Sequence, residues 1–190
     1  MNSFYTQEEL DLLGFKRIGK SVHISRKVSF YGISRIEIGN NVRIDDFCVL
    51  SAGAGGIIIG NYVHIAVFSS LMGDGCIRLD DFSGLSSRVS IYSSNDDYSG
   101  QHMTNPTVPS EFTGVFSSDV RIAKHVIVGS NSVIMPGVVL NTAVAIGAFS
   151  FVNRDCEEFS IYKGNPAKKI ADRSRNLLQF ESEFLINENL

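Results

Sequence analysis

An aliphatic residue recurs at every sixth position through most of this chain, and a small residue or a valine usually follows it four places later. All but one of the repeat positions hold Ile, Leu or Val, and the positions are Ile38, Ile44, Leu50, Ile59, Ile65, Leu71, Ile77, Ser83, Val89, Ile122, Val128, Ile134, Leu140, Ile146 and Val152. A helix repeats its apolar stripe near 3.6 residues, and a hairpin sheet alternates at two. A period of six predicts a parallel β-helix, in which three short strands make one coil of roughly 18 residues.

The repeat is interrupted at a few places. The step from Phe30 to Ile38 is eight residues and the step from Leu50 to Ile59 is nine, so we expect short insertions at corners of the coils. Asp81 and Ser83 place polar residues where the pattern requires a small and an aliphatic one. Such exceptions indicate either a functional site or a buried hydrogen-bonded network at a subunit interface.

The largest interruption lies between Val89 and Ile122, where a loop over residues 95–121 is predicted to leave the coils. Long loops without periodicity in compact domains are usually functional or disordered. This one contains apolar residues that are suited to a contact with a neighbouring subunit: Met103, Val108, Phe112, Val115 and Phe116. We therefore expect an excursion loop that docks on a second copy of the chain.

Both ends of the chain are predicted to be helical. Thr6 and Glu9 form a capping-box pattern, which predicts a short N-terminal helix within residues 1–14. Pro166 opens an amphipathic stretch, which predicts a C-terminal helix over residues 166–187. Between them the coils are expected over residues 20–165, so residues 1–190 form a single domain. Two terminal helices would cover the exposed strand edges of a β-helix.

The composition is that of one soluble domain. The chain has 190 residues and a net charge of −3, so it has no basic excess suggesting a nucleic-acid partner. Hydrophobic residues make up 44% of it, but no run approaches the roughly 20 apolar residues of a membrane helix. The N-terminus lacks a secretion signal, which predicts a cytoplasmic protein without membrane contact.

The cysteines are predicted to be buried core residues and not to form disulfide bonds. Three cysteines, an odd number, argue against a disulfide framework. Cys48 and Cys156 occupy the small position of the repeat, which predicts that both lie in the core.

Several repeats resemble those of a known family. The segments I-G-N-N-V-R, I-G-N-Y-V-H, V-G-S-N-S-V and I-G-A-F-S-F resemble the hexapeptide repeats of left-handed β-helix acyltransferases. The resemblance implies an all-β fold, a left-handed parallel β-helix of hexapeptide repeats. Its handedness is an expectation from the family, because most parallel β connections are right-handed.

A second block resembles the C-terminal signature of acetyl-CoA-dependent sugar acetyltransferases: I-V-G-S-N-S-V-I-M-P-G-V-V-L, A-I-G-A-F-S-F-V and I-Y-K-G-N-P-A-K-K-I. The resemblance implies acetyl-CoA as the acyl donor and a homotrimer with active sites between subunits. It also implies that Gly129, Gly147 and Ala148 contact the pantetheine arm. Lys168 and Lys169 are candidates for the nucleotide phosphates, since ammonium groups suit exposed phosphate. The alternative for both lysines is a solvated helix face.

Further motifs resemble a narrower group, the N-acyltransferases that act on dTDP-linked 4-amino-4,6-dideoxy sugars. These motifs are S-F-Y-T-Q-E-E-L-D-L-L-G-F, I-G-N-N-V-R-I-D-D-F-C-V-L, L-S-S-R-V-S-I-Y and D-D-Y-S-G. The resemblance implies transfer of an acetyl group to the amino group of dTDP-4-amino-4,6-dideoxy-D-glucose. The product would serve synthesis of a surface polysaccharide such as O-antigen.

The family resemblance implies the candidate catalytic residues, and the chemistry of an amine acceptor agrees with them. A deprotonated amine attacks a thioester without help, so a carboxylate such as Asp96 is enough to attract the ammonium form and accept its proton. Ser86 is a candidate to hold the amine or a neighbouring hydroxyl. Asp97, Tyr98 and Ser87 are candidates for substrate binding, although Asp97 has the alternative of capping backbone donors at the start of the loop.

The alternative reaction is O-acetylation of a sugar hydroxyl, which needs a base, usually histidine. Maltose and galactoside acetyltransferases place that histidine where the loop begins, and this chain has Asn95-Asp96-Asp97 there. His102 and His125 are the candidate bases for this alternative. His23 and His64 are expected to be surface or interface residues.

Two other classes fit less well. The spacings between the four histidines are 41, 38 and 23, so no close pair indicates a zinc site, and we expect no metal. A non-enzymatic scaffold would need neither the long loop nor the G-N-P-A-K-K block.

Overall fold

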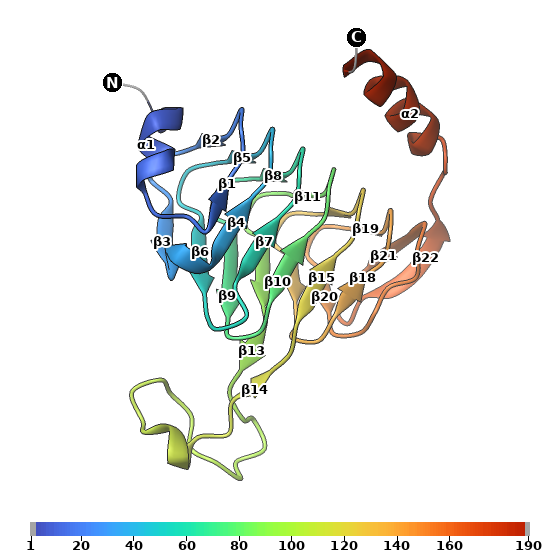
Figure 1. The fold of residues 1–190 in the computed structure, drawn as a ribbon. Coiled ribbons are helices and arrows are strands. Elements are labelled where there is room, and N and C mark those ends of the chain that lie inside the picture. Colours follow the sequence, from blue (N-terminus) through green and yellow to red (C-terminus); the bar gives the residue numbers. More distant parts are fainter. Residues whose placement is uncertain (1–2, 189–190) are drawn as a thin grey trace.

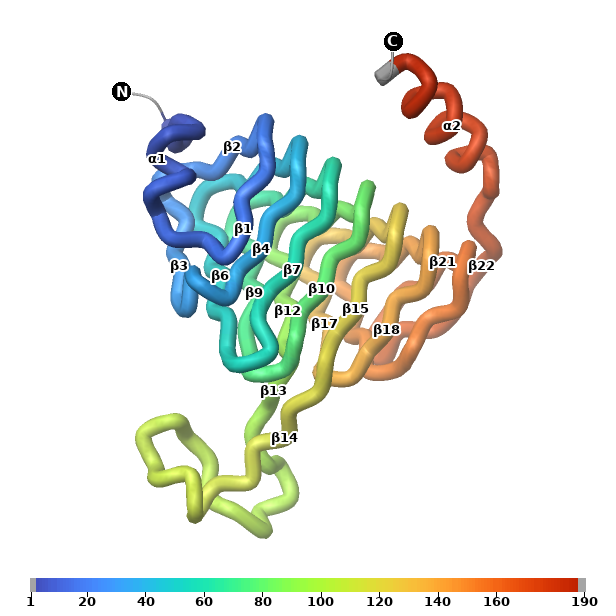
Figure 2. The backbone as a smooth tube through the Cα atoms, in the orientation of Figure 1, coloured from blue at the N-terminus to red at the C-terminus, as the bar shows by residue number. Residues whose placement is uncertain are grey.

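The structure is a computed structural model in which residues 3–188 are described. Three parallel sheets form the sides of a prism, and each coil of the chain contributes one short strand to each side (Figures 1 and 2). This arrangement confirms the predicted all-β parallel β-helix.

The first sheet has the order β1-β4-β7-β10-β15-β18, with bounds Arg17–Ile18, Ile36–Ile38, Ile57–Ile59, Ile77–Leu79, Val120–Ile122 and Val139–Leu140. The second sheet contains β2, β5, β8, β11, β16, β19, β21 and β22, with bounds His23–Ile24, Arg43–Ile44, His64–Ile65, Gly84–Leu85, Ile127–Val128, Ala145–Ile146, Ser160–Lys163 and Lys168–Asp172. The third sheet contains β3, β6, β9, β12, β17 and β20, with bounds Ser29–Tyr31, Val49–Ala52, Ser70–Gly73, Ser90–Tyr92, Val133–Ile134 and Phe151–Val152.

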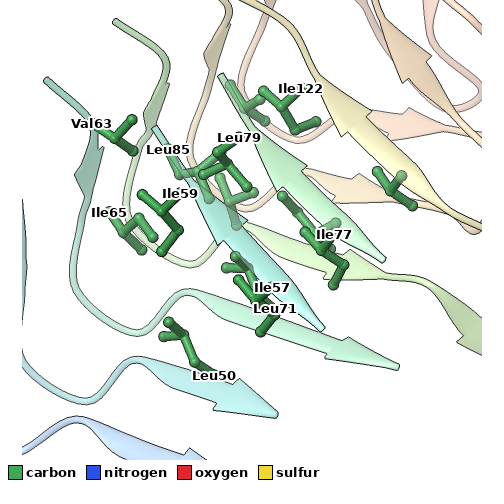
Figure 3. Packing of buried hydrophobic residues seen from close by; sticks show 14 of the residues in the cluster. Leu50, Ile57, Ile59, Val63, Ile65, Leu71, Ile77, Leu79, Leu85 and Ile122 are labelled. Atoms are coloured by element: carbon green, nitrogen blue, oxygen red, sulfur yellow. The ribbon is translucent and has the colours of Figure 1, made fainter. Parts of the chain in front are cut away.

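The aliphatic repeat positions stack inside the prism. Ile38, Ile59, Leu79 and Ile122 pair in register on the first sheet, and all four are fully buried. Figure 3 shows how such side chains from neighbouring coils pack against one another. Burial of this kind is worth about 25 cal/mol for each Å² of apolar surface removed from water. The stacked core therefore fixes the position of each outward-facing residue.

The structure corrects the register of one coil. Leu79, Leu85 and Ile91 are the residues that pair with Ile59, Ile65 and Leu71. The predicted positions Ile77, Ser83 and Val89 are each two residues too early, because the step from Leu71 to Leu79 is eight residues and not the six of the repeat. The polar exceptions thus disappear, since Ser83 occupies the small position of this coil. Asp81 accepts a hydrogen bond from the backbone of Asn61 at 2.7 Å.

Each coil turns through residues in the left-handed region of backbone space, which is uncommon for residues other than glycine. The first corner, between the first and second sheets, has φ near +60° at Ser21, Asn41, Tyr62, Phe82, His125, Ala143 and Phe159. The second corner, between the second and third sheets, has it at Phe47, Phe68, Arg88, Asn131 and Phe149. Side chains of successive coils therefore form columns along each corner.

The N-terminal helix α1 spans Gln7–Leu12, which is shorter than the predicted range of 1–14, and Met1 and Asn2 lie outside the described residues. The predicted capping box is confirmed, because the Thr6 hydroxyl accepts from the Glu9 backbone and the Glu9 carboxylate accepts from the Thr6 backbone. Leu10 is fully buried and belongs to the prism core. The helix therefore covers the N-terminal end of the coils.

The predicted C-terminal helix over 166–187 is wrong in its first part. Residues 168–172 form β22, which pairs antiparallel with β21, and α2 begins only at Leu177 and spans Leu177–Glu188. The backbone groups along β21 need partners at the end of the prism, and a returning strand supplies them where a helix does not. Lys168 and Lys169 thus lie on a strand.

The segment after β22 returns along the first corner. The Arg173 guanidinium donates to the carbonyl groups of His125 and Ala143 at 2.8 and 3.1 Å. Further on, the ring of Phe184 in α2 meets the rings of Tyr62 and Phe82 edge to face. The C-terminal segment therefore covers part of this corner.

The excursion loop leaves the prism through a two-stranded antiparallel stem of β13 (Ser94–Asn95) and β14 (Phe116–Ser117), and Figure 1 shows it projecting away from the coils. Two short 3-10 turns, Ile33–Arg35 and Ser110–Phe112, lie at a corner and in this loop. The loop is slightly shorter than predicted, because Val120 and Arg121 already belong to β15.

Two further sequence predictions can be compared with the structure. Cys48 and Cys156 are buried as predicted, and burial raises the pKa of their thiols to about 11 and about 12. Within residues 3–188, no helix is long and apolar enough to cross a membrane.

Candidate functional site

Ser86 and Asp96 lie in different hollows of the same chain. A cavity of about 350 Å³, which we call the serine cavity, is lined by His64, Ala66, Gly84, Leu85, Ser86, Ser87, Ile127 and Ser130. Two adjoining hollows of about 690 and 610 Å³ share Ser94, Asn95 and Asp96, and we call them together the aspartate cleft. One copy of the chain therefore does not bring the two predicted catalytic side chains into one cavity.

The strands of the second sheet build the serine cavity. The backbone N–H of Ser86 donates to the Val128 carbonyl at 2.9 Å, which fixes this residue just beyond β11. Gly84 stands in register beside His64, and a Cβ atom there would meet nothing within 4 Å. The absence of a side chain at Gly84 therefore leaves room beside the His64 ring.

The aspartate cleft lies where the excursion loop joins the third sheet. Asp96 follows β13 directly and is half-buried. The wall beside it is mainly apolar and comes from Tyr92, Val133, Met135, Phe151 and the exposed Tyr98. A carboxylate next to an apolar wall is suited to an ammonium group on a partly apolar ligand. The other side of the cleft is formed by the loop itself, including Pro106 and Val108.

Asp97 is occupied by contacts within the loop. Its carboxylate accepts from the backbone N–H of Ser99 at 2.7 Å and of His102 at 2.9 Å, and Nδ1 of His102 lies 3.4 Å away. Hydrogen bonds from Ser99, followed by those from His102, hold the pKa of Asp97 well below its usual range. This geometry matches the capping role, and substrate binding by Asp97 stays a prediction.

His125 lies at the first corner and lines neither the serine cavity nor the aspartate cleft. Its Nε2 atom is 2.7 Å from the Glu181 carboxylate of α2, and its ring stacks on Phe82 with centroids 5.1 Å apart. Only 12% of its side chain is exposed. These contacts give His125 a packing role between the corner and the C-terminal helix.

The residues predicted to bind the pantetheine arm of the acyl donor lie on the same side of the molecule as Ser86. Gly129 precedes Ser130 of the serine cavity, and a Cβ atom on Gly129 would come within 2.5 Å of the Ala148 nitrogen. Gly147 is overlaid by the aliphatic part of the Lys163 side chain. Neighbouring backbone and the Lys163 side chain thus leave little room for a side chain at either glycine.

The two candidate phosphate-binding lysines differ in their surroundings. Lys169 Nζ lies 2.9 Å from Asp172 and 3.2 Å from Glu157, and these pairs, Asp172 first, raise its pKa. Lys168 lines a hollow of about 210 Å³ together with Arg154 and Asn153. Arg154 was not a candidate in the sequence, and its guanidinium makes Lys168 the better placed of the two lysines for an anion.

Sequence reasoning expected His64 to be a surface or interface residue and did not foresee its contact with Asp45. Nε2 of His64 lies 2.8 Å from Oδ2 of Asp45, although 19 residues separate them in the chain. That separation is close to the length of one coil, so the repeat itself carried the signal that the two side chains stack on neighbouring coils. Within residues 3–188, no group of three His, Cys, Asp or Glu side chains is placed to hold a metal ion.

Comparison with known proteins adds close relatives over the whole chain. A dTDP-4-amino-4,6-dideoxy-D-glucose acyltransferase of Escherichia coli is 53% identical over 191 aligned positions, which cover 99% of this chain and 100% of the relative. No protein-family model matches the chain.

Solved structures give the same picture. The crystal structure of AntD, an N-acyltransferase from Bacillus cereus, in complex with dTDP and 3-hydroxybutyryl-CoA, is 45% identical with a TM-score of 0.96 and full coverage of both chains. Variants of AntD at an aspartate, and at a serine ten positions before it, have also been solved with nucleotide and coenzyme A. A maltose O-acetyltransferase from Clostridium difficile, 21% identical over 89% of this chain and 75% of its own with a TM-score of 0.59, shares the fold.

Proposed function

This chain belongs to the family of dTDP-4-amino-4,6-dideoxy-D-glucose acyltransferases, and from that premise we propose that it transfers an acyl group from coenzyme A to the amino group of dTDP-4-amino-4,6-dideoxy-D-glucose. The observation that carries the proposal is the 53% identity to the E. coli enzyme over the full length of both chains. Among acyl groups, acetyl is the one that the sequence motifs favour, and the 3-hydroxybutyryl-CoA bound by AntD makes longer groups the comparison to test.

Asp96 and Ser86 are the proposed reactive-site residues. They are ten positions apart, which is the separation of the aspartate and the serine that were substituted in AntD. Asp96 attracts the ammonium form of the sugar and takes the proton that it must lose before attack. Ser86 hydrogen-bonds the amine or the hydroxyl beside it. The acyl group passes directly from the thioester to nitrogen, with no acyl-enzyme intermediate.

The complete site is proposed to form between subunits of a homotrimer. Ser86 and Asp96 line separate hollows in one copy, so a neighbouring copy has to supply the second half of the site. The excursion loop supports this arrangement, because it exposes 88% of Tyr98 and more than half of each of Met103, Phe112 and Phe116. Contact with a second copy would cover these apolar groups.

The setting follows from the substrates. Acyl-CoA and nucleotide sugars are formed in the cytoplasm, so the enzyme is proposed to act there. Its product would supply an N-acylated sugar for a surface polysaccharide such as O-antigen.

The test is release of coenzyme A, measured as free thiol, with acetyl-CoA and longer acyl-CoA donors against dTDP-amino sugars and neutral sugar acceptors. We expect turnover on the 4-amino sugar, and a loss of about 100-fold or more in Asp96→Asn. Asp11→Asn, a change of the same kind on the exposed surface of α1, is the matched control and should retain full activity. Turnover only on a hydroxyl acceptor, with Asp96→Asn unaffected, would contradict the proposal and favour His102 or His125 as base.

A further inference from the structure

His64 and Asp45 have no role in the reaction as proposed above, although His64 lines the same cavity as Ser86. Nε2 of His64 lies 2.8 Å from Oδ2 of Asp45, and Oδ1 of Asp45 accepts from Nε of Arg43 at 2.7 Å. The Asp45 side chain is 13% exposed, whereas that of His64 is 52% exposed. The imidazole is therefore held from one side and open on the other.

The contact with Asp45 sets the tautomer of the ring. Burial opposes ionisation of Asp45, but the hydrogen bonds from His64 and Arg43 outweigh it and hold the pKa of Asp45 below its usual range. An ionised carboxylate only accepts hydrogen bonds, so Nε2 carries the hydrogen of the neutral ring and Nδ1 keeps the lone pair. No hydrogen bond to Nδ1 is found among residues 3–188. Nδ1 is therefore a base available to a ligand.

The surroundings of the ring suit a substrate more than a structural contact. Asp45 and Arg43 are the charged groups that face it from the neighbouring coil on one side. On the other side β11 brings Gly84, Leu85 and then Ser86, none of which titrates, and the space above Gly84 is empty. A ligand held by Ser86 in this cavity would thus lie next to the unprotonated nitrogen of His64.

We propose that His64 is a second catalytic residue of the acyl transfer, accepting a proton from the attacking amine, and that Asp45 is the positioning residue that sets its tautomer. The inference rests on the proposed function. The amine nitrogen bonds to the thioester carbonyl carbon, and the carbon–sulfur bond breaks as the tetrahedral intermediate collapses. The first proton of the former ammonium group, taken by Asp96, is released to solvent. The second passes to Nδ1 of His64 and then to the departing thiolate, so the products are the amide, coenzyme A and one proton.

The experiment measures kcat and KM for coenzyme A release between about pH 5.5 and about pH 8.5, a range in which imidazole changes charge. His64→Gln should lower kcat about 100-fold with little change in KM, and the acid limb of the wild-type kcat profile should disappear. Asp45→Asn should give a smaller loss and a displaced limb. His23→Gln is the matched control: His23 lies in the same column of the second sheet, in register with Arg43, and outside the serine cavity. It should behave as wild type.

A second variant probes the cavity without touching the histidine. Gly84→Val places a β-branched residue, which strands accept well, into the empty space beside the ring. It should raise KM at least about tenfold, the scale of one lost substrate contact, while the thermal midpoint is retained.

The outcomes separate the two proposals. If wild type turns over the amino sugar and His64→Gln keeps its kcat and its pH profile, the role of His64 is overturned and the proposed function stands. A change in KM alone also overturns it, because it shows a binding role. If wild type releases no coenzyme A with any amino sugar, the proposed function fails first and this inference falls with it.

Discussion

Two histidines of this chain make the same contact in opposite settings. His125 and His64 each place Nε2 within 2.8 Å of a carboxylate, from Glu181 and Asp45 respectively. His125 is 12% exposed and stacked on an aromatic ring, whereas His64 is 52% exposed and borders a cavity. The hydrogen bond to a carboxylate therefore does not distinguish a structural from a catalytic histidine. The distinction depends on whether the other side of the imidazole ring is covered by protein or open to a cavity.

The first and second corners of the prism differ in the same way, and His64 lies on β8 between them. At the first corner, Tyr62 and Phe82 stack with centroids 4.9 Å apart and Phe184 of α2 packs against both. At the second corner, Phe47 and Phe68 stack at 5.1 Å but remain 49% and 47% exposed. The repeat places a column of aromatic side chains at both corners. Packing of the C-terminal segment covers the column at the first corner and leaves the one at the second corner exposed.

The sharpest test of this comparison is the pair Phe82→Ala and Phe68→Ala. Both residues have φ near +60°, so the backbone strain of alanine is similar in the two variants and cancels. Urea unfolding should show a loss of about 3 kcal/mol for Phe82→Ala, the cost of truncating a packed phenylalanine. The loss for Phe68→Ala should stay below about 1 kcal/mol, since half of that ring is already in water. Equal losses would mean that α2 does not stabilise the first corner.

A second test asks whether His125 serves stability and not catalysis. His125→Gln should lower the free energy of unfolding by about 1 kcal/mol, because it weakens a mostly buried contact to Glu181 and a ring stack. Its kcat for coenzyme A release should stay at the wild-type value. A large loss of kcat in His125→Gln, with unchanged stability, would reverse the comparison and return His125 to the chemistry.

The smallest expected effect is on the thermal stability of the protein at low pH. Burial raises the pKa of Glu181, but hydrogen bonds from Lys124 and His125 outweigh it, so its pKa is lowered overall. A carboxyl group with a lowered folded-state pKa adds stability above its unfolded value, and this stability is lost as pH falls through the folded-state value. The thermal midpoint of wild type should therefore fall more steeply below about pH 4.5 than that of Glu181→Gln.

Glu183→Gln is the control for the acid experiment, because Glu183 is exposed on the same helix and its carboxylate accepts a hydrogen bond from the uncharged Gln179 side chain. Identical acid slopes in wild type and Glu181→Gln would show that the contacts of Glu181 with Lys124 and His125 add nothing to stability.

The fold could be predicted from the sequence because the same position of each six-residue repeat holds an aliphatic side chain that is buried in the core. The register of the coil that contains Leu79 was predicted two residues off, since a longer corner before it moves every following position without changing the period. The C-terminal helix was placed too early because Pro166 begins a turn as readily as a helix, and only the free edge of β21 decides between them.

The site was less predictable for a related reason. Asp96 stands out in the sequence, since it begins the segment that breaks the repeat. His64 and Asp45 sit within regular repeats, and their contact exists only because one coil lies on the next. Outward-facing residues are not restricted by the apolar pattern, so their partners depend on the number of residues in each corner.

The antiparallel stem of the excursion loop gives the protein a place where its length can change. β13 and β14 pair directly, so the two ends of the loop are held together whatever lies between them. The entropy of closing a longer loop grows only slowly with its length. A reporter peptide or a small domain inserted at the exposed Gly100 would thus be carried outside the prism, with every coil still in register. Deletions within this segment should likewise leave the rest of the molecule intact.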